Sequence, residues 1–194
     1  MPTGVALRDA REQLFAAAER ILLRDGPNAL TSRAVTMEAG VAKGVLHRHF
    51  ADFDAFLADL VLDRIAGLDD QAAELRGVAG TGAVADNLTA ALVALFEPVA
   101  VAIVALVISR DGLRARLREA GTARIPLLGE GTAMIRGYLD AERDLGRIAA
   151  GADTRTLAPT LTGAVHLLCT EMETAPPDSA EVRKVVTTVI AGAG

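Results

Sequence analysis

The sequence predicts an all-α protein, and this inference rests on its composition and on the spacing of its apolar residues. Of the 194 residues, 51% are hydrophobic but only 3% are aromatic. The core must therefore be built from Ala, Leu, Val and Ile, and with few turn-forming clusters this composition favours helices. Apolar residues also recur at intervals of three and four along most of the chain, the period of an amphipathic helix. We expect an N-terminal three-helix domain over residues 1–51 and a larger helical domain over residues 52–194.

The first helix is expected from Leu7 to Asp25, where Leu14, Phe15, Ala18, Ile21 and Leu22 form one apolar face. Asp9 and Glu12 have the spacing of a capping box at its start, and Gly26 followed by Pro27 ends it. The expected role of this helix is to support the two helices that follow.

Residues 31–50 form the most informative stretch of the sequence. Two segments compatible with helices, Ser32–Ala39 and Ala42–His49, are separated by Gly40 and Val41. Gly40 can adopt the left-handed conformation that ends the first segment. This spacing is typical of a helix-turn-helix, in which the second helix lies in the DNA major groove and the first crosses the backbone.

The segment LTSRAVTMEAGVAKGVLHRHFADFDAFLADLV, residues 30–61, resembles the DNA-binding signature of the TetR family of transcriptional regulators. The resemblance runs from about Ala10 to Val61, roughly a quarter of the chain. Three positions depart from the family pattern: Ala42 replaces a capping Ser, His47 a Tyr, and Phe53 a phosphate-binding Lys. The resemblance implies a double-stranded DNA operator as partner. The residues expected at the DNA are Thr31, Ser32, Arg33, Lys43, Gly44, Val45, His47 and Arg48.

The charge distribution supports a localised DNA site rather than general attraction to nucleic acid. The chain has a net charge of −5, and residues 1–63 carry seven basic against nine acidic side chains. Within residues 31–50 the balance is reversed, with Arg33, Lys43 and Arg48 against Glu38 alone. We therefore expect DNA binding with a shallower salt dependence than that of strongly basic proteins.

Asp52 is placed to cap a long connecting helix from Phe53 to about Arg76. Residues 83–109 are strongly apolar, and Pro98 is expected to begin a second helix there. A short helix with Arg110, Arg114 and Arg118 on one side follows. We interpret this basic side as a solvated face rather than a second nucleic-acid site.

Three further helices are expected, from Thr132 to Leu145, from Leu157 to Met172 and from Ser179 to Ala191, with residues 121–131 read as a loop or an interrupted helix. Thr156 is expected to cap the helix from Leu157 to Met172, which would place Pro159 in the first turn of that helix. In the resembled family the last two helices form a four-helix bundle with a second subunit. The sequence permits the same homodimer here.

A ligand pocket in the larger domain is expected among Phe96, Met134, Tyr138, His166 and Cys169, although these residues are equally suited to a plain core. His166, Cys169 and Glu173 share one helix face, but three ligands without a second cluster favour a core histidine and cysteine over a metal site. No metal or cofactor is predicted.

Other compartments and functions are disfavoured by the sequence. The single cysteine and the absence of a leader pattern predict a cytoplasmic protein. The apolar run Pro98–Ile108 is shorter than the ~20 residues of a membrane helix. No phosphate loop or catalytic triad points to an enzyme. We predict a ligand-responsive repressor that binds a palindromic operator as a dimer and is released by a small apolar or amphipathic effector. The alternative is a helical ligand-binding or interaction protein with weakened or lost DNA binding.

Overall fold

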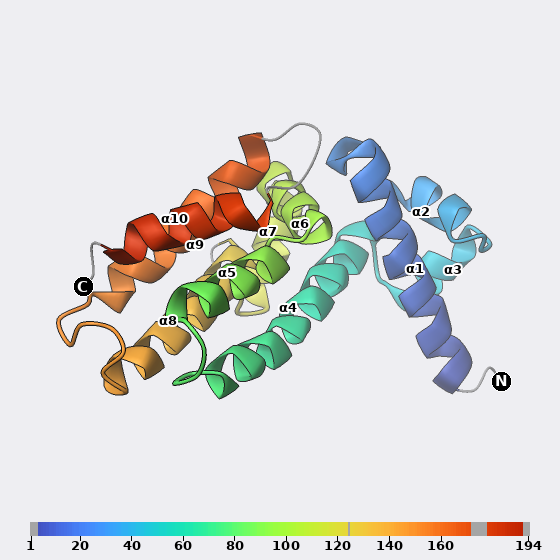
Figure 1. Ribbon diagram of the computed structural model, residues 1–194. Helices are drawn as coiled ribbons and strands as arrows, with labels where there is room; N and C mark the ends of the chain where they lie inside the picture. The colour runs from blue at the N-terminus through green and yellow to red at the C-terminus, as the bar shows by residue number, and fades with distance from the viewer. Residues whose placement is uncertain (1–3, 124, 172–177, 192–194) are drawn as a thin grey trace. The chain divides into compact units, whose positions relative to one another are not determined.

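The computed structural model describes residues 4–123, 125–171 and 178–191, and within these ranges it contains α-helices, one 3₁₀ turn and no strand (Figure 1). The predicted all-α class is therefore confirmed. The elements are α1 (Gly4–Asp25), η1 (Pro27–Ala29), α2 (Ser32–Glu38), α3 (Gly44–His49), α4 (Phe53–Gly77), α5 (Val84–Leu95), α6 (Pro98–Ser109), α7 (Asp111–Glu119), α8 (Leu128–Asp144), α9 (Thr154–Glu171) and α10 (Ser179–Ala191).

The chain divides into two compact units. The first consists of Met1–Asp63 together with Ala102–Ile125, and the second of Arg64–Val101 together with Pro126–Gly194. Helix α4 has 25 residues, a length of about 37 Å at 1.5 Å per residue, and contributes to both units. The division into domains 1–51 and 52–194 stays a prediction. The sequence did not lead us to expect residues 102–125 in the first unit.

An aromatic cluster forms the centre of the first unit. Phe15 of α1, Phe50 after α3 and Phe56 of α4 are buried, with ring centroids 5.1 to 6.1 Å apart. The Arg11 guanidinium lies over Phe15 and Phe50 and pairs with Asp59 at 3.0 Å. These contacts fix α1 and α4 around the end of α3, since large buried rings contribute heavily to core stability.

Helix α7 packs against the start of α4 within the same unit. Arg116 donates to the Asp52 carboxylate at 2.7 Å, Arg110 lies 3.6 Å from the Asp54 carboxylate, and the Arg110 guanidinium lies 5.3 Å from the Phe53 ring centroid. The predicted solvated face is wrong for Arg110 and for Arg114. The latter donates to the Val107 carbonyl at 3.1 Å and pairs with Asp111.

The second unit is built around the packing of α5, α8, α9 and α10, in which α8 packs on α9, α10 packs on α5 and α9, and α5 packs on α8 (Figure 1). Gly131 allows α8 to approach α5, because a Cβ there would lie 2.6 Å from a Leu95 methyl carbon. Arg183 of α10 pairs with Asp86 of α5.

A buried polar network ties the end of α8 to the α4–α5 connection. Asn87 donates to the Tyr138 hydroxyl at 2.9 Å and to the Thr81 carbonyl at 3.0 Å. The fully buried Glu142 carboxylate accepts from Gly80 N–H at 3.3 Å and lies 3.4 Å from Arg147. Burial and the neighbouring Glu142 carboxylate raise the pKa of Tyr138 to about 12.

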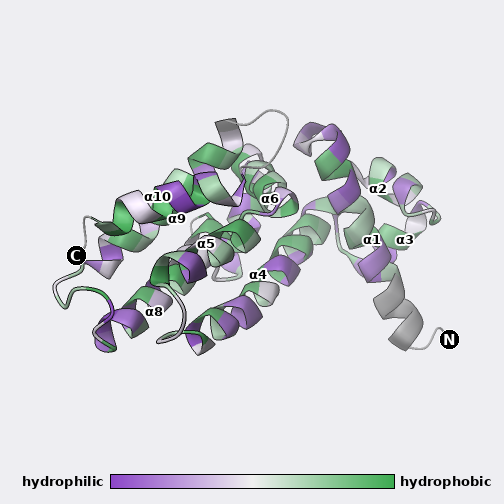
Figure 2. Ribbon diagram, in the orientation of Figure 1, coloured by the Kyte–Doolittle hydropathy of each residue, from purple (hydrophilic) through white to green (hydrophobic). Residues whose placement is uncertain are grey.

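Four helix starts differ from the prediction, among them that of α3, which begins at Gly44 rather than at Ala42. Helix α1 begins at Gly4, so the capping box predicted at Asp9 is wrong. Helix α8 begins at Leu128 rather than at Thr132, because the Glu130 carboxylate accepts from the Leu127 N–H at 2.8 Å and caps it earlier. The other predicted helices are present, with Pro98 in the first turn of α6, and Figure 2 shows that apolar residues dominate α6.

Helix α9 begins at Thr154, so Thr156 is not its cap and Pro159 lies inside the helix. The cap is Asp153, whose carboxylate accepts from the N–H groups of Arg155 and Thr156 at 3.1 and 3.3 Å. The hydrogen bond from the Thr156 hydroxyl is the largest cause of the lowered pKa of Asp153. Pro159 lacks the N–H that would bond to Arg155, and Arg155 is exposed, so water can satisfy its carbonyl.

Among the described residues, no single helix has both the length and the apolar composition to cross a membrane. Among these residues, only α5 and α6 taken together, a bent pair, have the required length and apolar composition.

Candidate nucleic-acid interface

Helices α2 and α3 form the predicted helix-turn-helix. Thr31 caps α2, its hydroxyl accepting from the Ala34 N–H at 3.1 Å. Gly40 has φ +66°, the left-handed conformation that the sequence predicts for the end of α2. The buried Thr36 hydroxyl donates to the Ser32 and Arg33 carbonyls, at 3.0 and 3.1 Å, and so turns its polar atom back onto its own helix. The two helices are thus locally well defined.

Helix α3 is short and amphipathic. Leu46 and the following Phe50 are buried and anchor it to the first unit. Lys43 stands at the N-cap position without a side-chain cap, and the preceding Ala42 has no hydroxyl to supply one. The Val45 N–H donates to the Ala42 carbonyl at 2.8 Å, so this first turn is closed by the backbone and not by a side chain.

The residues predicted at the DNA lie mostly at the surface of these two helices. Thr31, Arg33, Lys43, Gly44, His47 and Arg48 are exposed, and Ser32 and Val45 are half-buried. Their roles at DNA stay a prediction. Nothing lies within 4 Å of a Cβ built on Gly44, so the backbone there is open to a close approach.

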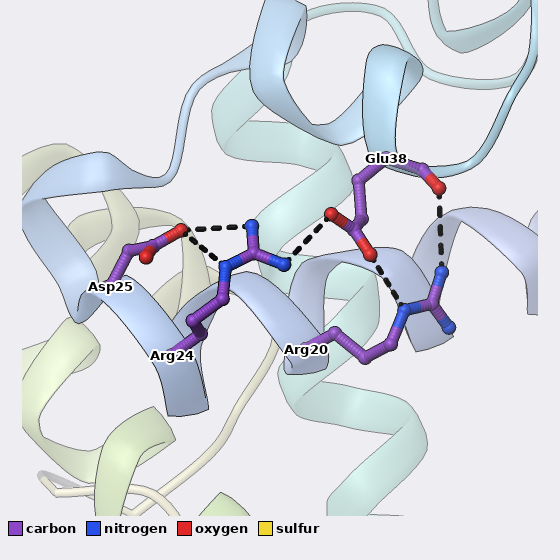
Figure 3. Close-up of polar contacts among 4 residues, drawn as sticks. All are labelled: Arg20, Arg24, Asp25 and Glu38. Carbon is purple, nitrogen blue, oxygen red and sulfur yellow. Dashed lines mark hydrogen bonds and ion pairs between the residues drawn. The ribbon is translucent and has the colours of Figure 1, made fainter.

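The only acidic side chain of residues 31–50 is withdrawn from this surface (Figure 3). The Glu38 carboxylate accepts from Arg20 at 2.8 Å and from Arg24 at 3.1 Å, both on α1. The hydrogen bond from Arg20, followed by that from Arg24, lowers the pKa of Glu38. Arg24 also pairs with Asp25 at 2.9 Å, and the hydrogen bond to Asp25 is the largest cause of the raised pKa of Arg24. Glu38 therefore stays ionised and is neutralised by α1.

Arg33, Lys43 and Arg48, by contrast, have no carboxylate within ion-pair distance in the part of the chain that the structure describes. The surface of α2 and α3 consequently carries three uncompensated positive charges. Such charges are free to replace the counterions of a phosphate backbone. The contribution of Arg20 and Arg24 was missed from the sequence, because a pairing 14 to 18 residues apart has no local signal.

The position at which the resembled family has a lysine is occupied by an aromatic stack. The Phe53 ring lies 5.6 Å from that of Phe56 and is covered by the Arg110 guanidinium. Arg110 is in turn paired with Asp54. The start of α4 thus lies beside the positive charge of Arg110, the residue that precedes α7, but this charge is also paired with the Asp54 carboxylate.

The second unit contains a cavity of about 290 Å³. It is lined by Gln71, Glu74, Leu75 and Val78 of α4, by Asn87 and three alanines of α5, and by Met134 of α8. Of the five predicted ligand residues, only Met134 is part of this lining. The buried Tyr138 is not part of this lining, but its hydroxyl accepts a hydrogen bond from Asn87, which is.

The remaining predicted ligand residues lie elsewhere in the second unit. Phe96 is buried and its ring lies 5.7 Å from that of the half-buried His166. Burial lowers the pKa of His166 and raises that of the half-buried Cys169. Glu173, the third group of the metal alternative, lies outside the described residues. The role of the five predicted residues in ligand binding stays a prediction.

Residues 14–60 match the family model of "Bacterial regulatory proteins, tetR family". The sequence matches none of the curated proteins with which it was compared. Among solved structures, a putative TetR-family transcriptional regulator from Mesorhizobium loti is similar, with a TM-score of 0.73 and 15% identity over 96% of this chain and 95% of that one.

Two further solved structures share the fold. The transcriptional regulator FadR from Bacillus subtilis, solved with stearoyl-CoA, has a TM-score of 0.67 and 15% identity over 93% of this chain and 98% of that one. The multidrug binding protein EbrR, solved with imidazole, has a TM-score of 0.60 and 20% identity over 93% and 94% of the two chains.

The helix-turn-helix occupies the residues matched by the family model, and the helices that follow have the arrangement found in these regulators. Residues 14–60 are thus similar to the tetR family of bacterial regulatory proteins, and the chain shares the fold of solved TetR-family regulators.

Proposed function

We propose that this protein is a repressor that binds a palindromic operator as a homodimer and is released by a small amphipathic effector. The observation that carries the proposal is the set of three unpaired cations, Arg33, Lys43 and Arg48, on a helix-turn-helix whose only acidic residue is neutralised from α1. Two copies of α3 about 34 Å apart would enter successive major-groove turns of the operator.

The roles of the individual residues follow from their positions. Thr31, Ser32 and Arg33 at the start of α2, and Lys43 and Gly44 at the start of α3, are suited to phosphate contacts. Val45, His47 and Arg48 would face base edges, Val45 by apolar contact and the other two by hydrogen bonds. Arg48 is the strongest candidate for discrimination, because a guanidinium can donate two hydrogen bonds to a guanine.

Electrophoretic titration against the protein's own upstream region tests this assignment. Lys43→Ala should weaken binding to all sequences alike, whereas Arg48→Ala should also change base preference. Arg118→Ala is the matched control, since Arg118 is an exposed arginine of the same unit outside the helix-turn-helix. Absence of any salt-sensitive complex would refute DNA binding and support the alternative of a ligand-binding protein without an operator.

The homodimer is proposed through α9 and α10, the segments predicted as Leu157–Met172 and Ser179–Ala191. Small or apolar exposed residues follow one face of α9 at alternating spacings of four and three: Thr156, Thr160, Gly163, Leu167 and Thr170. Such a face allows a second helix to approach closely. Met172 lies outside the described residues.

Sedimentation analysis of one matched pair of variants tests the dimer. Leu167 and Leu145 are similarly exposed, at 57% and 58%, but only Leu167 lies on α9. Leu167→Glu should shift the protein toward monomer because it would bury a charge at the interface, and Leu145→Glu should not. Dimerisation unaffected by Leu167→Glu would place the interface elsewhere.

Ligand response is supported by the 290 Å³ cavity and by neighbours solved with small molecules, FadR with stearoyl-CoA and EbrR with imidazole. The cavity is lined by α4, whose first residues belong to the DNA-binding unit. A ligand that binds one position of α4 better than another would shift the equilibrium between DNA-binding and released forms.

A further inference from the structure

The cavity between α4, α5 and α8 is small, and its polar side consists of one carboxylate and two amide side chains. Its volume of about 290 Å³ is at the lower end of the ~300–1,000 Å³ of small-molecule sites, so it suits a compact ligand. Leu75, Val78, Met134 and three alanines provide an apolar wall. The remaining lining residues are Gln71, Glu74 and Asn87.

Each of these three residues can offer an acceptor atom to a ligand. The Gln71 side-chain oxygen is buried and has no hydrogen-bond partner in the described part of the chain. Glu74 contributes a carboxylate one helical turn further along α4. The Asn87 side-chain nitrogen is already committed to Thr81 and Tyr138, which leaves its oxygen as the free atom. No arginine, lysine or histidine lines the cavity.

From this set of atoms we infer that the effector is a compact amphipathic cation, a protonated amine on an apolar body of about the size of the cavity. This inference rests on the proposed ligand response and names its chemistry. A buried acceptor without a partner is costly, and an ammonium group supplies up to three donors. An anion would meet the Glu74 carboxylate with no basic group to compensate it.

A bound amine would contact Asn87, which is hydrogen-bonded to residues outside the cavity. A ligand N–H that donates to the Asn87 side-chain oxygen would contact the residue whose nitrogen donates to the Tyr138 hydroxyl and to the Thr81 carbonyl. The Thr81 carbonyl also accepts from Arg147 at 3.2 Å, and Arg147 pairs with the buried Glu142. The cation would therefore bind beside the network that fixes the α4–α5 connection.

Three rigid probes with the same apolar body test the inference: 1-adamantylamine, 1-adamantanol and 1-adamantanecarboxylate. Titration calorimetry on the full chain should rank the amine tightest, the alcohol next and the carboxylate weakest. Gln71→Leu and Glu74→Gln should each weaken the amine about tenfold or more, since each removes a bond to a charged group. Gln71→Glu should strengthen it, which guards against loss of binding through misfolding.

Asp70→Asn is the control, because Asp70 is an exposed acid of α4 outside the cavity lining, and it should leave the amine affinity unchanged. A carboxylate that binds as tightly as the amine, or no binding of any probe at millimolar concentration, would overturn the inference. Amine binding in the expected order without any effect on the operator complex would support the ligand class and instead refute the proposed ligand response.

Discussion

The salt dependence of operator binding can be estimated from the ion pairs of the first unit. Arg33, Lys43 and Arg48 are unpaired, whereas Arg20 and Arg24 are occupied by Glu38. Because Arg48 is assigned to base edges, a dimer would place four cations on the phosphates, two copies of Arg33 and Lys43. At about 0.9 counterions per contact, the logarithm of the association constant should fall with the logarithm of salt with a slope of about −4. A fourfold rise in salt would weaken binding by about 150-fold.

Fluorescence anisotropy with a labelled operator at several salt concentrations measures this slope. Lys43→Ala removes two of the four phosphate contacts in a dimer, so its slope should be shallower by about 2. Arg118→Ala should leave the slope unchanged, because this exposed arginine lies on α7. If Lys43→Ala retained the wild-type slope, or if the wild-type slope were near zero, the reasoning from unpaired cations would be refuted.

Three other predictions concern stability. Gly131→Ala should destabilise the protein by about 1–3 kcal/mol in urea unfolding, because its Cβ would overlap the α5 leucine; Gly137→Ala in the same helix has open space and should stabilise by about 1 kcal/mol, and equal effects would contradict the close approach. Tyr138→Phe should cost about 1–3 kcal/mol, since it leaves one donor of the half-buried Asn87 amide without its acceptor, and unchanged unfolding would show that this donor finds another acceptor. Because the pKa of Glu38 is lowered in the folded state, its ion pairs stabilise the protein above the unfolded value of about 4.3 and this stabilisation is lost as pH falls through the folded value. The melting-temperature difference between wild type and Glu38→Gln should therefore be largest near neutral pH and close in acid, and a difference independent of pH would contradict this.

The features that sequence predicts well here are those with local causes. Gly40 and Asp52 were identified as a helix end and a helix cap because each acts on backbone groups within a few residues, and the structure confirms both. The start of α9 was misplaced for a related reason. Thr156 and Asp153 are both competent caps, and Asp153 binds the first amides, so the helix accepts Pro159 in its interior.

The features that sequence missed depend on residues far apart in the chain. Glu38 finds its partners 14 and 18 residues away, and Arg116 finds Asp52 at a separation of 64. The cavity lined by α4, α5 and α8 was also not predicted as such, because it is formed where small alanines of α5 lie beside α4. Small residues are visible in a sequence, but whether the space beside them stays empty depends on which helices pack there.

The first unit is made from two separate stretches of chain, with residues 64–101 inserted between them. Asp52 and Asp54, which follow α3, pair with Arg116 and Arg110 from the second of these stretches. A chimera that exchanges only residues 1–63 between regulators would therefore carry these two aspartates without Arg110 and Arg116. The compact unit that contains the helix-turn-helix is discontinuous, so a transfer of this unit should include residues 102–125 together with the N-terminal segment.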